Sequence, residues 1–285
     1  MSTTDATPEG AVQAGDGPST PVERFEHGAQ GRIAAVSFEL ARRNYLGTIR
    51  IPGTIVPILV MPVFFVLAFG GAFGALTDLP GFPTDNILNW MVPFAVLQGA
   101  SFAGLGAAFS AGRDLETGFY DRLLLAPAPR LSLATGPLSF SAVRALLPVL
   151  IVVPVGFLGG ARFVDLPLGL LVLVVAAVGT GIAAGLWGLG VVYRLRTQRA
   201  GALVQVGIFA VLFLSVGQVP LEAMDGTWLE PVARLNPMTR ILTMARSGYL
   251  EPVTWSVVWP GLLALAVAIV GLALFAWRGF TKLER

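Results

Sequence analysis

The sequence predicts an all-α integral membrane protein with six transmembrane helices, and three observations support this class. Of its 285 residues, 55% are hydrophobic and only 13% are charged, whereas a soluble domain carries roughly 25% charged residues. The mean hydropathy is +0.75. Six separate segments are apolar over the roughly 20 residues that a membrane crossing needs. The composition therefore excludes a soluble globular enzyme and a disordered protein, and the absence of cysteine excludes a disulfide-rich secreted domain.

The first 31 residues form one predicted unit, and residues 32–285 form the membrane domain. Residues 1–22 are rich in Thr, Pro, Gly, Ala and Ser without an apolar run, so we expect a disordered cytoplasmic tail rather than a signal or transit peptide. From Arg32 to Arg50, apolar residues are interspersed with arginines. This pattern predicts an amphipathic helix in the membrane interface. Pro52-Gly53 is a natural break after it; the alternative is one helix continuous with the first span.

The apolar segments place the spans in order along the chain. We expect them at about 51–75, 87–111, 131–158, 166–193, 200–219 and 255–277. The second and fourth are rich in Gly, Ala and Ser, and small residues let helices approach closely. The closely packed helices are expected to belong to one chain, and a dimer face is the alternative.

The segment 220–252, before the last span, is too apolar for a free loop and too interrupted for a span. Short re-entrant or interfacial helices on the outer side fit it. An ordinary lid over the bundle is the alternative interpretation.

Basic residues set the predicted orientation. If the six spans hold, fourteen of the 19 Lys and Arg residues lie on the side of the two termini and four on the opposite side, with Arg144 inside the third span. Cytoplasmic loops collect basic residues. The sequence therefore predicts a multi-pass protein of the plasma or inner membrane with both termini in the cytoplasm.

The sequence contains no pattern typical of a catalytic site or a metal site. The only histidine, His27, lies in the tail, and His, Cys, Asp and Glu do not cluster at ligand spacing. A nucleotide-binding P-loop needs a Gly-Lys-Ser/Thr sequence, but the only lysine is Lys282, after Phe280-Thr281. We therefore expect no cofactor in this chain, no enzymatic site, and, at a net charge of +2, no nucleic-acid partner.

Arg144 is the one ionisable side chain expected at membrane depth. It could extend its guanidinium to the inner interface. The alternatives are a contact with an acidic group of the loop 113–121 or with a phosphate of a substrate.

The loop between the second and third spans carries three acidic residues and three arginines around Leu115, Phe119, Leu123 and Leu124, and ends near Pro127. This predicts a short amphipathic helix suited to docking in a groove of a soluble partner. By composition alone, a solvated surface loop is the alternative.

Two motifs resemble those of a known family. Glu116-Thr117-Gly118, followed by Asp121-Arg122-Leu123-Leu124 and Pro127, resembles the cytoplasmic loop of ABC type-2 exporter permeases. The run Leu235 to Thr239 reads Leu-Asn-Pro-Met-Thr and resembles the motif before the last span in that family. The resemblance covers 32–285 and is strongest to the daunorubicin-resistance-type drug and lipid exporters of actinobacteria.

The resemblance implies a permease that works as a homodimer, or as a heterodimer with a related permease, in contact with membrane lipids. Separate P-loop ATPase subunits would bind ATP and Mg and dock on a coupling helix. That helix would contain Glu116, Thr117, Gly118, Asp121, Arg122, Leu123 and Leu124. Asn236, Pro237 and Met238 would belong to an outer gate.

The expected function is export of a hydrophobic or amphipathic substrate, such as a drug, a lipid or a lipid-like natural product. A polysaccharide or glycolipid exporter is an alternative, which the low numbers of Tyr and Trp, 4 and 6, disfavour. A stand-alone secondary transporter or channel is another, and the absence of a carboxylate within the spans disfavours it.

Overall fold

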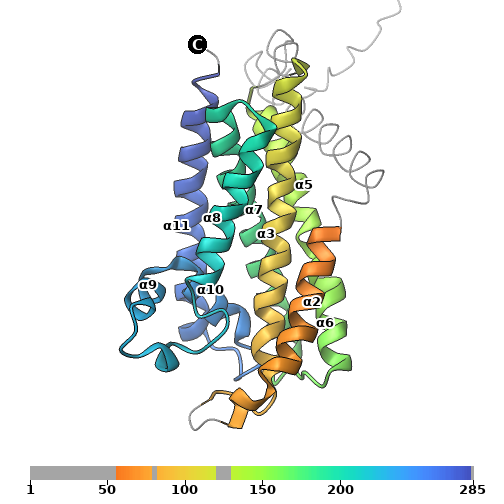
Figure 1. Ribbon diagram of the computed structural model, residues 1–285, viewed down its shortest axis with the longest axis vertical. Helices are drawn as coiled ribbons and strands as arrows, with labels where there is room; N and C mark the ends of the chain where they lie inside the picture. The colour runs from red at the N-terminus through yellow and green to blue at the C-terminus, as the bar shows by residue number, and fades with distance from the viewer. Residues whose placement is uncertain (1–55, 79–81, 120–129, 284–285) are drawn as a thin grey trace, which may run out of the picture.

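The computed structural model describes residues 56–78, 82–119 and 130–283, and this part of the chain is helical without strands (Figure 1). The α-helices are α2 Val56–Ala72, α3 Ile87–Glu116, α5 Arg130–Arg144, α6 Leu146–Leu158, α7 Leu166–Leu195, α8 Gly201–Phe213, α9 Leu229–Leu235, α10 Pro237–Arg246 and α11 Trp255–Phe280. Short 3-10 turns are η2 Gly74–Asp78, η3 Gln198–Ala200 and η4 Leu221–Met224. The expected tail and interfacial helix lie outside the described residues.

Four helical segments of the described chain are long and apolar enough to cross a membrane: 87–116, 136–158, 166–195 and 255–280. The all-helical class is therefore confirmed, whereas the count of six spans is not. The helices at the other two expected spans, α2 and α8, are shorter. With 13 residues, α8 is about 20 Å long, less than the about 30 Å of a bilayer's hydrocarbon core.

The third expected span consists of two helices, α5 and α6, which meet at Ala145. Pro148 explains the break, because a proline has no N–H to donate to the carbonyl of Arg144, four residues earlier. The two helices still follow one path through the bundle (Figure 1).

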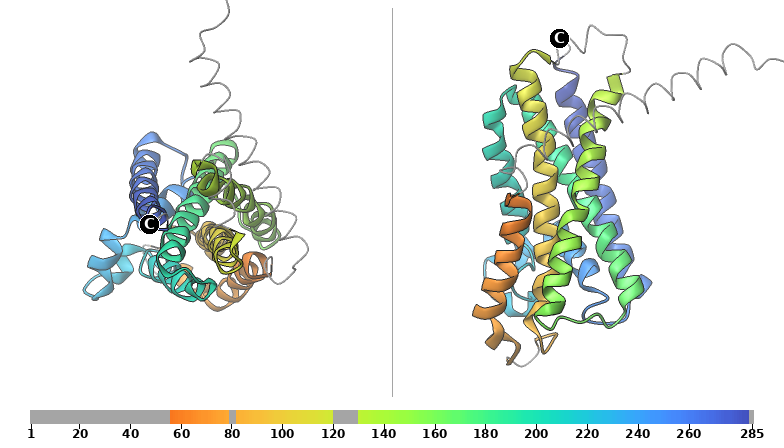
Figure 2. Two further views of the ribbon diagram at one scale, coloured as in Figure 1. Left: turned by 90° about the horizontal axis from the view of Figure 1, so that it is seen from above. Right: turned by 90° about the vertical axis from the view of Figure 1, so that its right-hand side faces the viewer.

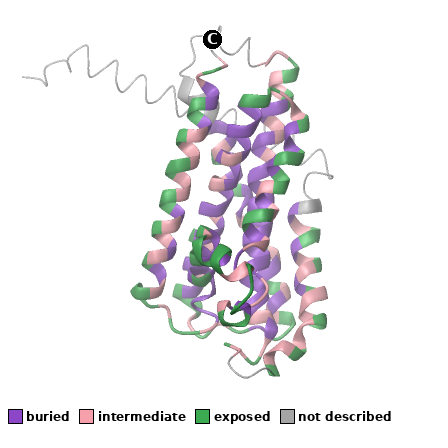
Figure 3. Ribbon diagram, turned by 60° about the vertical axis from the view of Figure 1, so that its left-hand side comes forward, coloured by how far each residue is buried: buried purple, intermediate pink, exposed green. Residues whose placement is uncertain are grey.

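Helix α3 is the centre of the bundle, as the view from above shows (Figure 2). In its most apolar 18-residue window 89% of the residues are buried, against 17% in α11 at the edge. Buried residues accordingly gather in the middle, and the outer helices are exposed on one face (Figure 3). That outer face is apolar, as at Leu263 and Val267, which suits a helix facing lipid.

Small residues bring α3 and α7 into close contact. A Cβ added to Gly104 would collide with the carbonyl oxygen of Gly181, and one added to Gly188 would lie 2.7 Å from the Cβ of Ala108. The expected close packing of the second and fourth spans thus occurs within one chain.

The loops divide between the two ends of the bundle (Figure 1). The end of α3, the start of α5, the α7–α8 connection and the end of α11 share one end. The α2–α3, α6–α7 and α10–α11 connections share the other. We call the first end, where α3 ends and α5 begins, the loop end, and we call the opposite end the far end.

Candidate translocation and coupling sites

At the loop end, helix α3 stops at the Glu-Thr-Gly motif. The Thr117 hydroxyl donates to the carbonyl of Arg113 at 2.9 Å. Gly118 follows with φ of +66°, a left-handed conformation that glycine adopts without strain. The Thr-Gly pair is therefore a helix stop that turns the chain away from α3.

Glu116 joins this helix end to the connection between α7 and α8. Its Oε1 accepts hydrogen bonds from the Thr197 hydroxyl at 2.9 Å and from the Gln198 backbone N–H at 2.8 Å. The backbone of Gly112 also lies against Gln198. Because α8 begins at Gly201, these contacts couple the position of α3 to that of α8.

Asp121, Arg122, Leu123 and Leu124 lie outside the described residues. Their predicted part in docking an ATPase therefore stays a prediction. The structure brings Glu116, Thr117 and Gly118 together at one turn, directly before them.

Toward the far end, Asn236 connects the end of α8 to the start of α10. Its Oδ1 accepts from the backbone N–H of Met238 at 2.9 Å, and Pro237 follows it in the first turn of α10. Its side-chain amide donates to the carbonyls of Val211 at 2.7 Å and Leu214 at 2.9 Å. One asparagine thus caps the beginning of one helix and supplies donors to the end of another.

Arg246 completes the same junction from inside the protein. Its side chain is 1% exposed and donates to the carbonyls of Trp90 at 3.1 Å, Val216 at 2.6 Å and Gly217 at 2.7 Å. The guanidinium carbon lies 3.5 Å from the centre of the Trp90 ring, a cation–π contact.

Sequence reasoning placed Arg246 in an outer loop and missed this role. Its partners are backbone carbonyls, which no spacing of side chains announces. The one feature of the sequence that marked Arg246 was its position in an apolar segment, two residues before Gly248.

Arg144 is 4% exposed. Its guanidinium lies against Gly106 and 5.1 Å from the centre of the Phe140 ring. The side chain of Arg144 is thus buried among helices of the bundle, and its predicted contact with the loop 113–121 or with a substrate phosphate stays a prediction.

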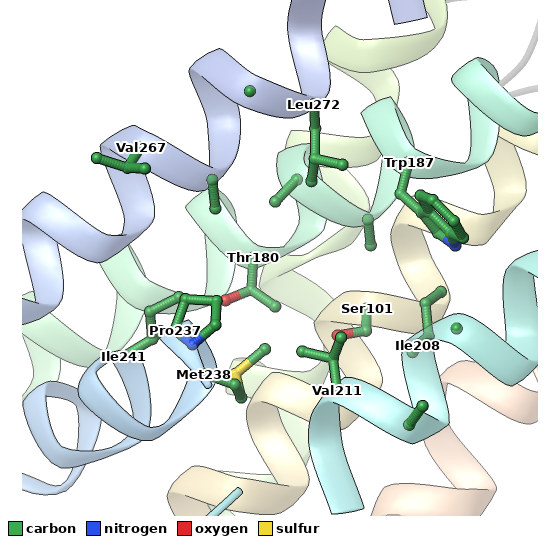
Figure 4. A pocket seen from close by; sticks show the side chains of 16 residues that line it. Ser101, Thr180, Trp187, Ile208, Val211, Pro237, Met238, Ile241, Val267 and Leu272 are labelled. Atoms are coloured by element: carbon green, nitrogen blue, oxygen red, sulfur yellow. The ribbon is translucent and has the colours of Figure 1, made fainter. Parts of the chain in front are cut away.

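A cavity of about 590 Å³ lies between α3, α7, α8, α10 and α11 (Figure 4). That volume is in the range of about 300–1,000 Å³ typical of small-molecule sites. Its wall is apolar except for two hydroxyl-bearing residues. The lining consists of Ser101, Thr180, Ala183, Ala184, Trp187, Gly207, Ile208, Ala210, Val211, Pro237, Met238, Ile241, Val267, Ala268, Gly271 and Leu272.

Two sets of residues form the opposite ends of this cavity. Trp187 stacks on Phe275 of α11 with ring centres 5.6 Å apart and donates its indole N–H to the Val204 carbonyl of α8 at 3.2 Å. Pro237 and Met238 lie on the other side (Figure 4). The Asn-Pro-Met motif of the sequence thus reaches the cavity, with Met238 buried against it.

No titratable side chain is among the described residues that line this cavity. The hydrogen bond from Arg234 to Glu230, 2.8 Å long, lowers the pKa of that carboxyl. Burial raises the pKa of the Tyr249 phenol, so the phenol stays neutral. Among the residues that the structure describes, no group of three His, Cys, Asp or Glu side chains could hold a metal ion.

The described part of the chain thus consists of apolar helices around an apolar cavity. Comparison with known proteins gives the family. Residues 37–250 match the model of the ABC-2 type transporter family. The chain therefore belongs to that family of transport permeases, whose members normally work with an ATPase subunit.

Curated relatives carry the name putative transport permease ycf38. The protein of Porphyra purpurea is 28% identical over 205 residues, 70% of this chain and 69% of the relative. The protein of Cyanophora paradoxa is 26% identical over 217 residues, 74% of this chain and 73% of the relative. That of Pyropia yezoensis is 27% identical over 225 residues, 76% and 74% respectively.

Proposed function

We propose that this chain is the membrane-spanning subunit of an ATP-driven exporter for a hydrophobic or amphipathic substrate. The ATP and Mg sites lie on a separate ATPase subunit, which docks on the segment containing Asp121, Arg122, Leu123 and Leu124. The complex contains two permeases, with both termini and the loop end in the cytoplasm. Within the family, the resemblance of the motifs favours the daunorubicin-resistance-type drug and lipid exporters.

The observation that carries the proposal is the hydrogen-bonded link from Glu116 to Thr197 and Gln198. A force applied beyond Gly118 reaches α3 directly and reaches α8 through this link. Both helices line the cavity, α3 with Ser101 and α8 with Gly207, Ile208, Ala210 and Val211. Docking at one end of the bundle can thus change the width of a cavity near its middle.

The outer part of the path follows from the short helix α8. We propose that six segments cross the bilayer and that α9 and α10 form a re-entrant unit entering from the outer side. This unit completes the path of α8, because Asn236 and Arg246 satisfy the carbonyls exposed where α8 stops. Asn236, Pro237 and Met238 then stand between the cavity and the outer side, as a gate would.

The cargo is hydrophobic because the cavity wall offers few polar groups. A polysaccharide needs many hydrogen-bonding partners along its path, whereas this wall has hydroxyls at Ser101 and Thr180 only.

Two variants, studied in the complex with the cognate ATPase, distinguish docking of the ATPase from transmission of its movement to α8. Leu123→Asp removes an apolar anchor of the coupling helix, worth about 2 kcal/mol or more, and should release the ATPase in a pull-down. Glu116→Ala leaves the docking segment intact but removes the link to α8. It should retain the ATPase and abolish the stimulation of ATP hydrolysis by a hydrophobic substrate.

Glu116→Gln is the control for Glu116→Ala, since its amide oxygen can still accept the hydrogen bonds from Thr197 and Gln198. It should leave both readouts near wild type. If a hydrophobic substrate still stimulates ATP hydrolysis normally in the Glu116→Ala complex, the proposed transmission through this link is wrong. If Leu123→Asp retains the ATPase while the permease stays folded, the docking proposal is wrong.

A further inference from the structure

The cavity lies at the mid-depth of the bundle. Thr180 stands 14 residues from the first and 15 residues from the last residue of α7, and Ser101 has the same place in α3. With a rise of about 1.5 Å per residue, each is about 20 Å from either helix end. A molecule in the cavity therefore meets these hydroxyls at a depth where bilayer lipids have only hydrocarbon.

Thr180 differs from other buried hydroxyls of the described helices. The hydroxyl of Ser101 donates to the Leu97 carbonyl at 2.8 Å, and that of Ser141 donates to the Pro137 carbonyl at 3.1 Å. Such bonds to the preceding turn are the ordinary way to satisfy a hydroxyl in a membrane helix. Thr180 is 3% exposed, and its Oγ1 has no hydrogen-bond partner among the described residues. A buried hydroxyl without a partner costs free energy, which a ligand can recover.

The cavity has a side opening between α8 and α11. At its edges, Val211 of α8 is 42% exposed and Val267 of α11 is 64% exposed. Gly271 lies on the same side of α11, and a Cβ added there would meet no atom within 4 Å. Trp187 holds the two helices apart at one end and α10 occupies the other. A long apolar molecule can therefore enter sideways from the hydrocarbon layer.

We propose that this cavity binds cargo with a defined chemistry: one long apolar chain or fused apolar body that carries a hydroxyl or carbonyl near its middle, bonded to Thr180. The inference rests on the proposed transport function only where it names the bound molecule as cargo. Ordinary acyl chains lack a polar atom at this depth, so Thr180 selects against the surrounding lipid.

Two photoreactive C18 fatty acids test the site, one with a mid-chain hydroxyl and one without, each with a diazirine near the chain end. Labelled residues of the purified permease in nanodiscs are mapped by peptide mass spectrometry. The hydroxylated probe should label α8, α10 and α11 around the cavity about fivefold more than the plain probe, the gain from one net hydrogen bond. Thr180→Val keeps the volume and should abolish that preference. Thr243→Val is its control, because the Thr243 hydroxyl bonds back to the Thr239 carbonyl and does not line the cavity.

Gly271→Leu fills the opening and should abolish labelling by both probes. Gly71→Leu is its control, since a Cβ at Gly71 of α2 also meets open space, away from the cavity. Equal labelling by both probes, or labelling that survives Gly271→Leu, would overturn the site. Neither result touches the docking of an ATPase, because these measurements use the permease alone.

A final measurement decides whether the bound molecule is cargo. In proteoliposomes containing the complete complex, ATP should reduce cavity labelling by the hydroxylated probe, because turnover moves the probe out of the site. Labelling that ATP leaves unchanged, in a complex that hydrolyses ATP, would overturn the assignment as cargo.

Discussion

A charged side chain sits inside the far end of the bundle without a carboxylate partner among the described residues. Arg246 is tolerated there because three carbonyl oxygens and the face of Trp90 replace its hydration. The planar guanidinium can direct several N–H groups to separate carbonyls at once, which a lysine ammonium cannot do in the same geometry. The residue therefore works through its shape as much as through its charge.

Replacing Arg246 by lysine should lower stability although the charge is retained. Losing the donors to Val216 and Gly217 leaves buried carbonyls unsatisfied, and we expect a loss of about 2 kcal/mol. The midpoint of thermal unfolding in nanodiscs measures this. Arg240→Lys is the control, as Arg240 is exposed on the same helix. Equal midpoints for the two variants would contradict the role.

One substitution can separate the two roles of Asn236, which are capping α10 and donating hydrogen bonds to the carbonyls at the end of α8. Asn236→Asp keeps the oxygen that caps α10 but removes the N–H donors to Val211 and Leu214 and brings a negative charge to two carbonyls. We expect a lower unfolding midpoint, with a loss of about 1–3 kcal/mol.

Asn86→Asp is the matched control for Asn236→Asp. Asn86 caps α3 through the same type of bond, to the N–H of Leu88 at 2.9 Å, so an aspartate there should be nearly neutral. A similar effect of the two changes would mean that the amide donors of Asn236 contribute little.

Sequence reasoning recognised Asn236, Pro237 and Met238 as a motif, but not what the motif contacts. The side-chain partners of Asn236 on α8 are backbone carbonyls 22 and 25 residues earlier. Backbone groups look alike in every residue type, so a single sequence does not record such contacts. The same reason hid the link between Glu116 and the backbone of Gln198.

Among whole elements, the pair α3 and α7 depends on small residues. Gly104 faces the backbone of α7 at Gly181 and Gly185, where neither side can move without shifting a helix. Composition predicted that each of these helices would pack closely within the chain, because runs of Gly and Ala in membrane helices serve close approach, but it did not predict that they would pack on each other.

The change Gly104→Ala should therefore destabilise the protein by about 1–3 kcal/mol through overpacking, despite alanine's better helix propensity. The same substitution at Gly71, where open space surrounds the new methyl group, should be neutral or slightly stabilising. The difference between the two unfolding midpoints is the measurement. Equal midpoints would show that α3 and α7 can separate without cost.

The end of α8 was predicted less well. The apolar run suggested a span to residue 219, yet the helix ends at Phe213. Turns follow because partners from α10 supply the hydrogen bonds that a longer helix would have made for itself. Local hydropathy measures only the apolar character of a segment, not whether another segment will satisfy its backbone.

For the molecule as a whole, the arginine count of the sequence predicts that the loop end faces the cytoplasm. The absence of cysteine makes this testable by labelling single cysteines in intact cells. Arg199→Cys at the loop end should react only after permeabilisation, whereas Glu251→Cys at the far end should react from outside. Both positions are exposed. Labelling of residue 199 from outside would reverse the proposed orientation.

The helical class and membrane character followed from composition, because a chain with so few charges cannot cover itself with a water-facing surface. Composition predicted the number of crossings less firmly, since α2 and α8, as far as the structure describes them, fall short of spanning length. The cavity could not be foreseen either, as its wall draws on five helices far apart in the sequence.

The dependence of α8 on later residues also has a consequence for synthesis. When α8 leaves the ribosome, Asn236 and Arg246 have yet to emerge from it, so the carbonyls at its end have no donors from the chain. A nascent α8 at the translocon would wait near water or lipid headgroups until α10 follows it. On the proposed topology, insertion of α8 is completed only with the arrival of α9 and α10, and a chain cut before residue 236 would leave α8 poorly held in the bilayer.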